Sequence, residues 1–161
     1  MKGFDKKYKA KPTEDSGIVV RGKQVLVQLL CVDEHGAVLL QRHKKGPLKG
    51  LSTGLIVPVE DGETPEAAAR REFFCGPGWT RGPLERGAVF TFIDADGTVT
   101  VEHEFVARTG ASAAQPAGWR WVGRDDLDFA AMPADDAHWY GRVLDGEKLV
   151  GQFVFGPGKN V

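Results

Sequence analysis

The sequence predicts an α+β fold in which a mixed β-sheet is sandwiched between α-helices. Strand-like and helix-like segments alternate irregularly, short turns join neighbouring strand-like segments as hairpins, and two segments have helical composition. The length of 161 residues fits one domain of ordinary size. We therefore expect a single domain over residues 17–161, preceded by a flexible, polar, lysine-rich leader over residues 1–16.

The amino-acid composition and the net charge restrict which kinds of protein this chain can be. Hydrophobic residues make up 42% of the chain and charged residues 27%, which is typical of a globular protein and not of a disordered one. The formal net charge of −1 gives no reason to expect a nucleic-acid polymer or a membrane surface as partner. Two cysteines, Cys31 and Cys75, indicate neither a disulfide framework nor a zinc site. These features favour a cytoplasmic protein.

The N-terminal half begins with a predicted hairpin. The aliphatic run Val25–Val32 reads as a buried strand, Asp33–Gly36 has turn chemistry, and Ala37–Arg42 returns as a second strand. A basic loop over His43–Gly50 and a short strand within Leu51–Val59 follow.

The first helix has marked ends. Thr64 is a good N-cap, Pro65 suits the first helical position, and Glu66 complements the positive end of the helix dipole. Strong helix formers continue to Phe74, and Gly76–Gly78 ends the helix.

The C-terminal half returns to strands before and after a second helix. That helix carries two acidic residues in its first turn. The expected strands are Gly87–Ile93, Thr98–Arg108, Trp119–Val122 and Leu149–Phe155; the turn is Asp94–Gly97, the loop is residues 110–118, and the helix is Asp135–Leu144.

The segment from Val57 to Trp79 resembles the Nudix box, G-x5-E-x7-R-E-U-x-E-E-x-G-U, in which U is bulky and apolar. The matching positions are Glu63, Arg71, Glu72, Phe73, Gly78 and Trp79. The departures are Val57 at the opening glycine and Cys75 and Gly76 at the two later glutamates.

The resemblance implies catalytic roles for Glu63, Arg71 and Glu72 and a magnesium ion beside a substrate diphosphate. The missing acids lie three and four residues after Glu72, on the same helix face. Cysteine is a soft ligand and glycine has no side chain, so we expect Mg²⁺ to bind weakly or not at all. The alternative is an ordinary amphipathic helix with an exposed Arg-Glu pair.

The resemblance extends beyond the box. The segment from Trp121 to Tyr140 is similar to the C-terminal part of the oxidised-purine nucleoside triphosphatases, the MutT homologues of animals. This implies that Asp135 and Asp136 hold the edge of a purine base, one as a protonated donor and the other as a charged acceptor. The alternative is a pair of solvated acids that stabilise a helix start.

The same resemblance implies other pocket positions. Phe90 and Phe92 alternate on one strand, where the family has aromatic pocket walls, although core packing explains them equally. Thr53 occupies the position of the family's amide-bearing residue, and Pro133 replaces its tryptophan. Lys44 is a candidate phosphate contact, or simply a solvated side chain.

Glu102 and Glu104 are two residues apart and share a strand face. Since the family has an additional acid on a strand in this region, we expect one of them, Glu102 being the candidate metal ligand, to point toward the helix that carries Glu72. The alternative is a solvated face, with His103 pointing inward.

Three functions follow from these residues. The first is a Nudix protein that acts on a nucleotide-like or other small diphosphate with weak or divergent catalysis, either with a metal ion or without one. The second is a non-hydrolytic module that binds a purine-like molecule. The third is a different acid/base reaction in the same pocket.

Overall fold

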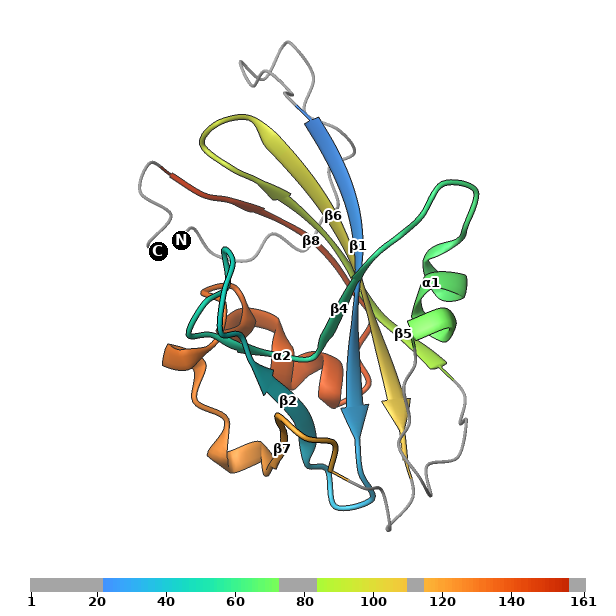
Figure 1. The fold of residues 1–161 in the computed structure, drawn as a ribbon, viewed down its shortest axis with the longest axis vertical. Helices are drawn as coiled ribbons and strands as arrows, with labels where there is room; N and C mark the ends of the chain where they lie inside the picture. The colour runs from blue at the N-terminus through green and yellow to red at the C-terminus, as the bar shows by residue number, and fades with distance from the viewer. Residues whose placement is uncertain (1–21, 73–83, 110–114, 157–161) are drawn as a thin grey trace.

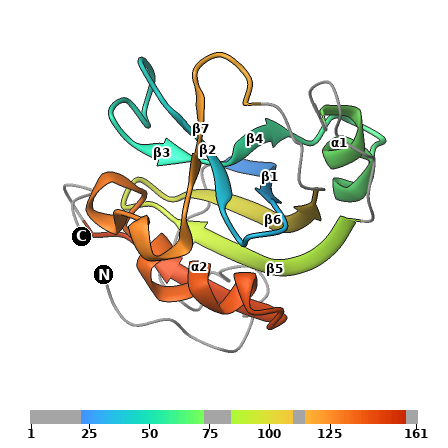
Figure 2. The ribbon, with the colours of Figure 1, turned by 90° about the horizontal axis from the view of Figure 1, so that it is seen from below.

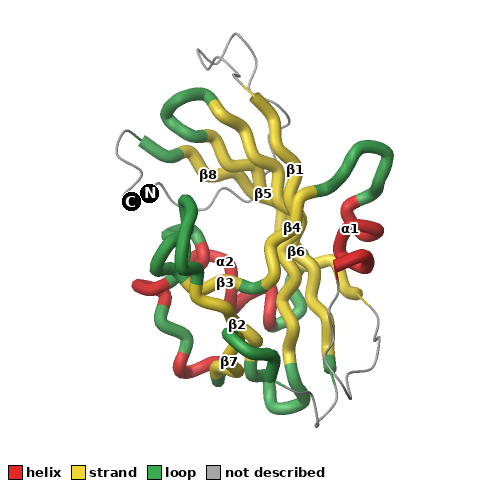
Figure 3. The backbone as a smooth tube through the Cα atoms, in the orientation of Figure 1, coloured by secondary structure: helices red, strands yellow, loops and turns green. Residues whose placement is uncertain are grey.

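The computed structural model describes residues 22–72, 84–109 and 115–156, so the predicted leader lies outside the described residues. Its centre is a mixed sheet with the order β3-β2-β1-β6-β5-β8, in which β4 also pairs with β1 and β7 with β2 (Figure 1, Figure 3). The strands are β1 (Gly22–Val32), β2 (Val38–Arg42), β3 (Ser52–Thr53), β4 (Leu55–Pro58), β5 (Leu84–Ile93), β6 (Thr98–Arg108), β7 (Trp119–Val122) and β8 (Leu149–Val154). The predicted α+β class is confirmed.

Strand β1 organises the sheet. It runs parallel to β6 in unbroken register from Gly22↔Thr98 to Val32↔Arg108, and its middle pairs antiparallel with β4. The predicted hairpin from β1 to β2 forms only at its turn, at the pair Val32↔Val38. Beyond the turn β2 leaves β1 and pairs with β3 and β7, because β4 takes the adjoining edge of β1.

The two α-helices lie on opposite faces of the sheet (Figure 2). Helix α1 (Pro65–Glu72) covers a core that includes Val27, Leu29 and Phe105. Helix α2 (Asp136–Leu144) covers a core that includes Leu30 and Val106. Successive strand residues point to opposite faces, so the odd-numbered residues of β1 and β6 face α1 and the even-numbered ones face α2.

Local signals set the ends of these helices. The Thr64 hydroxyl oxygen accepts a hydrogen bond from the backbone N–H of Ala67 at 3.1 Å, which confirms the predicted N-cap. The predicted continuation to Phe74 lies outside the described residues. Two 3₁₀ turns, Arg124–Asp126 and Phe129–Ala131, lead into α2.

In the described part of the chain, no helix has the length and hydropathy needed to cross a membrane.

Gly54 lies where two strands approach closely. A Cβ atom at this position would meet the carbonyl oxygen of Leu29 at 2.5 Å. The Gly54 backbone N–H also donates to Gln28 Oε1 at 3.1 Å. Glycine therefore lets the chain after β3 pass close enough to β1 to orient the Gln28 side chain.

We predict that Gly54→Ala lowers the free energy of unfolding by about 1–3 kcal/mol, because backbone atoms must shift to relieve the overlap. Gly156→Ala is the matched control, since no atom lies within 4 Å of a Cβ built there. Urea denaturation of both variants measures the difference. Equal stability of the two would contradict the close approach.

Candidate functional site

A cavity of about 490 Å³ opens on the α2 side of the sheet. Its size is that of a small-molecule site. Apolar side chains form most of its wall, and several acidic side chains converge on it. The lining residues used below are Leu26, Gln28, Ile56, Phe92, Asp94, Glu102, Pro133, Asp135, Asp136 and Phe155.

Asp135 and Asp136 come from the start of α2 and are buried, with 6% and 1% of their surfaces exposed. The alternative of solvated acids is therefore wrong. Asp135 makes no side-chain cap to the helix; its Oδ2 accepts a hydrogen bond from the Trp139 indole N–H at 2.8 Å instead. Each of the two carboxyl groups also affects the pKa of the other. Two carboxyl groups that share a proton can present a donor and an acceptor.

A second acidic pair comes from β6. The Gln28 amide nitrogen donates to Glu102 Oε1 and to Glu104 Oε2, both at 3.1 Å. The parallel register places Gln28 opposite Glu104, with all three side chains on the α2 face. Glu104 is 1% exposed, so this face is not solvated as the alternative had it.

Burial controls the charge of these groups. Burial raises the pKa of Glu104 well above its usual range, and the charges of Glu102 and Asp136 raise it further. Burial and then Asp135 raise the pKa of Asp136 in the same way. Burial also raises the pKa of Asp135 and of Glu102, although hydrogen bonds from Trp139 and from the Glu104 carboxyl oppose the two shifts. Burial therefore favours the protonated form most strongly at Asp136 and Glu104, the more deeply buried member of each pair.

Three buried oxygen atoms in this region have no hydrogen-bond partner: Glu104 Oε1, Asp136 Oδ2 and the Tyr140 hydroxyl. Burial and the nearby Asp136 raise the pKa of Tyr140 well above its usual range. Unsatisfied buried polar atoms are costly and uncommon in folded proteins. Asp136 lines the cavity, so a ligand there can satisfy one of these atoms.

The other predicted pocket residues divide between wall and core. Phe92 lines the cavity, whereas Phe90 is fully buried against Trp139, with ring centres 5.1 Å apart. Thr53 is also fully buried; its hydroxyl donates to the Gly54 carbonyl at 2.8 Å and contacts the His43 ring at 2.7 Å. Lys44 is exposed and outside the cavity lining. Phe90, Thr53 and Lys44 are thus not in its wall.

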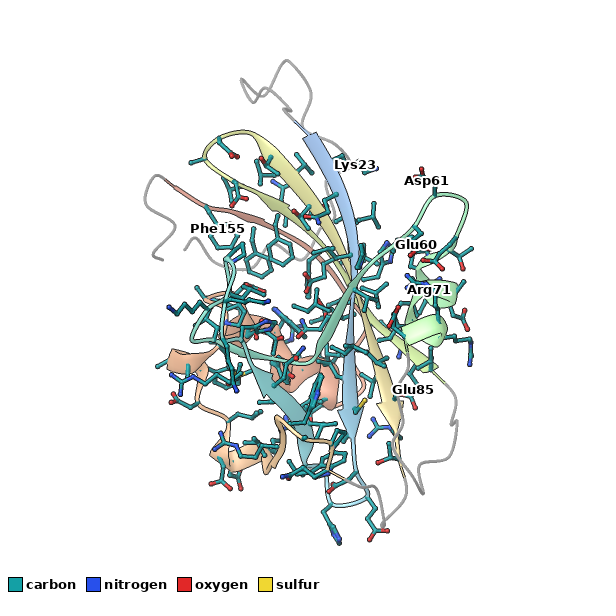
Figure 4. All side chains as sticks on the ribbon, viewed as in Figure 1. Lys23, Glu60, Asp61, Arg71, Glu85 and Phe155 are labelled. Atoms are coloured by element: carbon teal, nitrogen blue, oxygen red, sulfur yellow. The ribbon has the colours of Figure 1, made fainter. Side chains whose placement is uncertain are left out.

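The Nudix-box residues lie elsewhere, with Arg71 and Glu72 on α1 and Glu63 in the loop before it. Arg71 donates to both Glu63 carboxylate oxygens, at 2.8 and 3.1 Å, and to the Pro58 carbonyl at 3.1 Å. It also pairs with Glu72. The Arg71 side chain lowers the pKa of Glu63. Figure 4 shows Arg71 and Glu60 together beside α1, across the sheet strands from Phe155. This network ties the loop before α1 to the helix.

The expected approach of Glu102 or Glu104 to the helix carrying Glu72 is wrong. Even-numbered residues of β6 face α2, whereas Glu72 borders a separate cavity of about 290 Å³ with Leu29 and Leu39 on the α1 face. Glu72 and Glu102 therefore lie on opposite faces of the sheet. A metal site built from both does not form.

The described residues near the box do not fit a hard cation. Glu72 is engaged by Arg71, and Val57 is packed in the core at 7% exposure. Within residues 22–72, 84–109 and 115–156, no group of three or more His, Cys, Asp or Glu side chains is arranged to hold a metal ion. Cys75 and Gly76 lie outside these ranges, and their side-chain chemistry is unsuited to magnesium.

Sequence reasoning missed Gln28, Trp139 and Tyr140 as parts of the site. Gln28 had a detectable signal, because it is the one polar residue in the apolar run 25–32. Trp139 and Tyr140 had none, since aromatic residues on a helix usually belong to a core.

Fold and sequence together define the class of protein. The NUDIX domain model matches residues 22–145, and the chain belongs to this family. Solved structures with the same fold include a MutT protein from Bacillus halodurans, with a TM-score of 0.67 and 23% identity over 85% of this chain and 93% of that one. A MutT NUDIX hydrolase from Burkholderia pseudomallei has a TM-score of 0.58 and 22% identity over 73% of this chain and 96% of that one.

Two similar animal proteins are named for their activity. The chain is 31% identical over 137 residues to the oxidized purine nucleoside triphosphate hydrolase of Danio rerio, covering 81% of this chain and 86% of the relative. The Mus musculus protein of the same name is 28% identical over the same length. The chain is therefore a Nudix protein similar to oxidized purine nucleoside triphosphate hydrolases.

We predict that Glu104→Gln increasingly stabilises the protein relative to the wild type as pH rises above about 5. An acid with a raised pKa in the folded state keeps a proton that the unfolded chain releases. Its contribution to stability is therefore present at acidic pH and lost as pH rises through the folded pKa. Chemical denaturation across the pH range measures the effect, with exposed Asp61→Asn as control. A constant difference between Glu104→Gln and the wild type would contradict a buried, protonated Glu104.

Proposed function

We propose that this protein binds a purine-like nucleoside or nucleotide through its base, and that it hydrolyses diphosphates far more slowly than its hydrolase relatives. The observation that carries the proposal is the buried Asp135–Asp136 pair at the wall of the cavity, with one Asp136 oxygen unpaired. A base edge that alternates donor and acceptor atoms would complement it.

The walls of the cavity support a flat ligand. The rings of Phe92 and Phe155 are stacked with centres 6.1 Å apart, and Leu26 and Ile56 also line the space. Pro133 stands where the similar family has a tryptophan, so one stacking partner is replaced by a smaller apolar surface. The similarity to oxidized purine nucleoside triphosphate hydrolases agrees with a purine-like ligand. These features support the binding of a flat ligand more strongly than they support selectivity between similar bases.

Weak hydrolysis follows from the Nudix box. Nudix hydrolases use divalent metals, and magnesium would need several carboxylates near Glu72. The sequence offers Cys75 and Gly76 in place of two of them. Arg71 instead donates hydrogen bonds to both Glu63 and Glu72, which gives the three residues a structural role in holding α1 against the preceding loop.

The second candidate function is an acid/base reaction in the same cavity. Burial raises the pKa of both Glu102 and Glu104, and carboxyl groups with raised pKa values are suited to proton transfer near neutral pH. Turnover that survives EDTA and is lost in Glu102→Gln would favour this function. Turnover that stops with the chelator would argue against it.

For the binding function, we predict that Asp136→Ala weakens binding of purine nucleosides and nucleotides by about 10- to 100-fold, because a buried hydrogen-bonding group of the ligand would be left without its partner. Thermal-shift titration followed by calorimetry measures the affinities, with Asp61→Asn as control. The melting curve of unliganded Asp136→Ala shows whether it remains folded. Unchanged ligand affinity in a folded Asp136→Ala protein would reject the pocket.

For the hydrolytic function, we predict that the wild type shows little magnesium-dependent phosphate release from nucleoside triphosphates. The double variant Cys75→Glu/Gly76→Glu should raise it by at least about tenfold, because it adds two oxygen ligands for a hard cation. Glu72→Gln in that background should remove the gain. Vigorous magnesium-dependent release by the wild type would show that the box is functional as it stands.

A further inference from the structure

More carboxyl groups line the cavity than are required to hydrogen bond to the edge of a neutral base. Asp94, Glu102, Asp135 and Asp136 line it, whereas none of its described lining residues is Lys, Arg or His. The second pair, Glu102–Glu104, is held in place by Gln28, whose carbonyl is in turn fixed by the Gly54 backbone N–H. The register between β1 and β6 therefore fixes the positions of these two acids.

The cavity wall supplies no counter-ion for these carboxyl groups among its described lining residues. Burial raises the pKa of Glu102, Asp135 and Asp136, because charges in a low-dielectric site without a counter-ion are unfavourable. The exposed His138 opposes this effect at Asp135, but it does not line the cavity. A cation bound in the cavity would stabilise the charged forms of these acids.

The geometry also limits the shape of that cation. The Asp136 residue, whose Oδ2 has no partner, is 1% exposed and lines the cavity together with the stacked Phe92 and Phe155 rings. A flat group with several N–H donors along one edge would reach the acids while its faces contact apolar side chains. A compact metal ion or a flexible ammonium would leave these apolar walls unused.

We propose that the ligand is a planar heterocycle with a positively charged, donor-rich edge of the amidinium or guanidinium type. This inference rests on the proposed binding function and specifies the class of molecule bound. In it Asp135 and Asp136 receive one part of the edge. Glu102, backed by Glu104 and Gln28, supplies the second negative charge that selects a cation over a neutral base.

The test compares two probes of nearly the same outline near neutral pH. 2-Aminobenzimidazole becomes a guanidinium-like cation on protonation, whereas 2-aminobenzoxazole stays neutral. Isothermal titration calorimetry with the full-length protein should show the first probe binding at least about tenfold more tightly, since a buried charge pair outweighs a neutral hydrogen bond. Glu102→Gln should bring the ratio of the two affinities close to one, whereas Glu104→Gln, a neutral replacement for a carboxyl whose pKa is raised by burial, should change the ratio less. Asp61→Asn should keep the wild-type ratio.

Each outcome bears on the inference in a defined way. Equal affinities for the two probes in the wild type would overturn it, and so would an unchanged ratio in Glu102→Gln. Binding of purine nucleosides but not of 2-aminobenzimidazole would overturn it while leaving the proposed function intact. No binding of probes or of purine nucleosides would reject both. Melting curves of both glutamine variants verify that they are folded, and Glu102, the less buried residue, gives the decisive comparison.

Discussion

The parallel pairing of β1 with β6 is the constraint on which the rest of the molecule depends. Its eleven residue pairs set one register, and that register decides which side chains meet on each face of the sheet. It puts Gln28 beside Glu104 on the α2 face and leaves Leu29 and Phe105 to pack under α1. A slip of one residue would send the acids to the α1 core and the apolar residues to the cavity.

The acidic groups in the cavity lower the free energy of unfolding. Four buried or partly buried carboxyl groups, two of them with an unpaired oxygen, oppose folding through desolvation and mutual repulsion. Perturbed groups of this kind gather at functional sites, where a ligand can relieve the strain. The Gln28 amide and the Trp139 indole hold the acids in position, so the cavity is pre-organised for such a ligand.

The Nudix box of this chain divides into two parts. Arg71 bridges Glu63 and the Pro58 carbonyl and so holds α1 against the loop that precedes it. Cys75 and Gly76 stand at two positions where the box pattern has glutamate. Different atoms serve the structural and the catalytic roles of such a motif, so one part can be kept while the other changes. The function proposed above therefore uses the cavity on the α2 side of the sheet.

The sequence by itself determined the elements, because their signals are local: the Thr64 cap, the turn at Asp94–Gly97 and the aliphatic run of β1. Residue patterns and family resemblance also pointed to Asp135 and Asp136. Only the tertiary structure decided that β2 leaves β1, that Glu102 and Glu72 lie on opposite faces, and that Phe90 belongs to the core. These outcomes depend on pairing between segments distant in the chain, and strand alternation shows which residues share a face but not what that face meets.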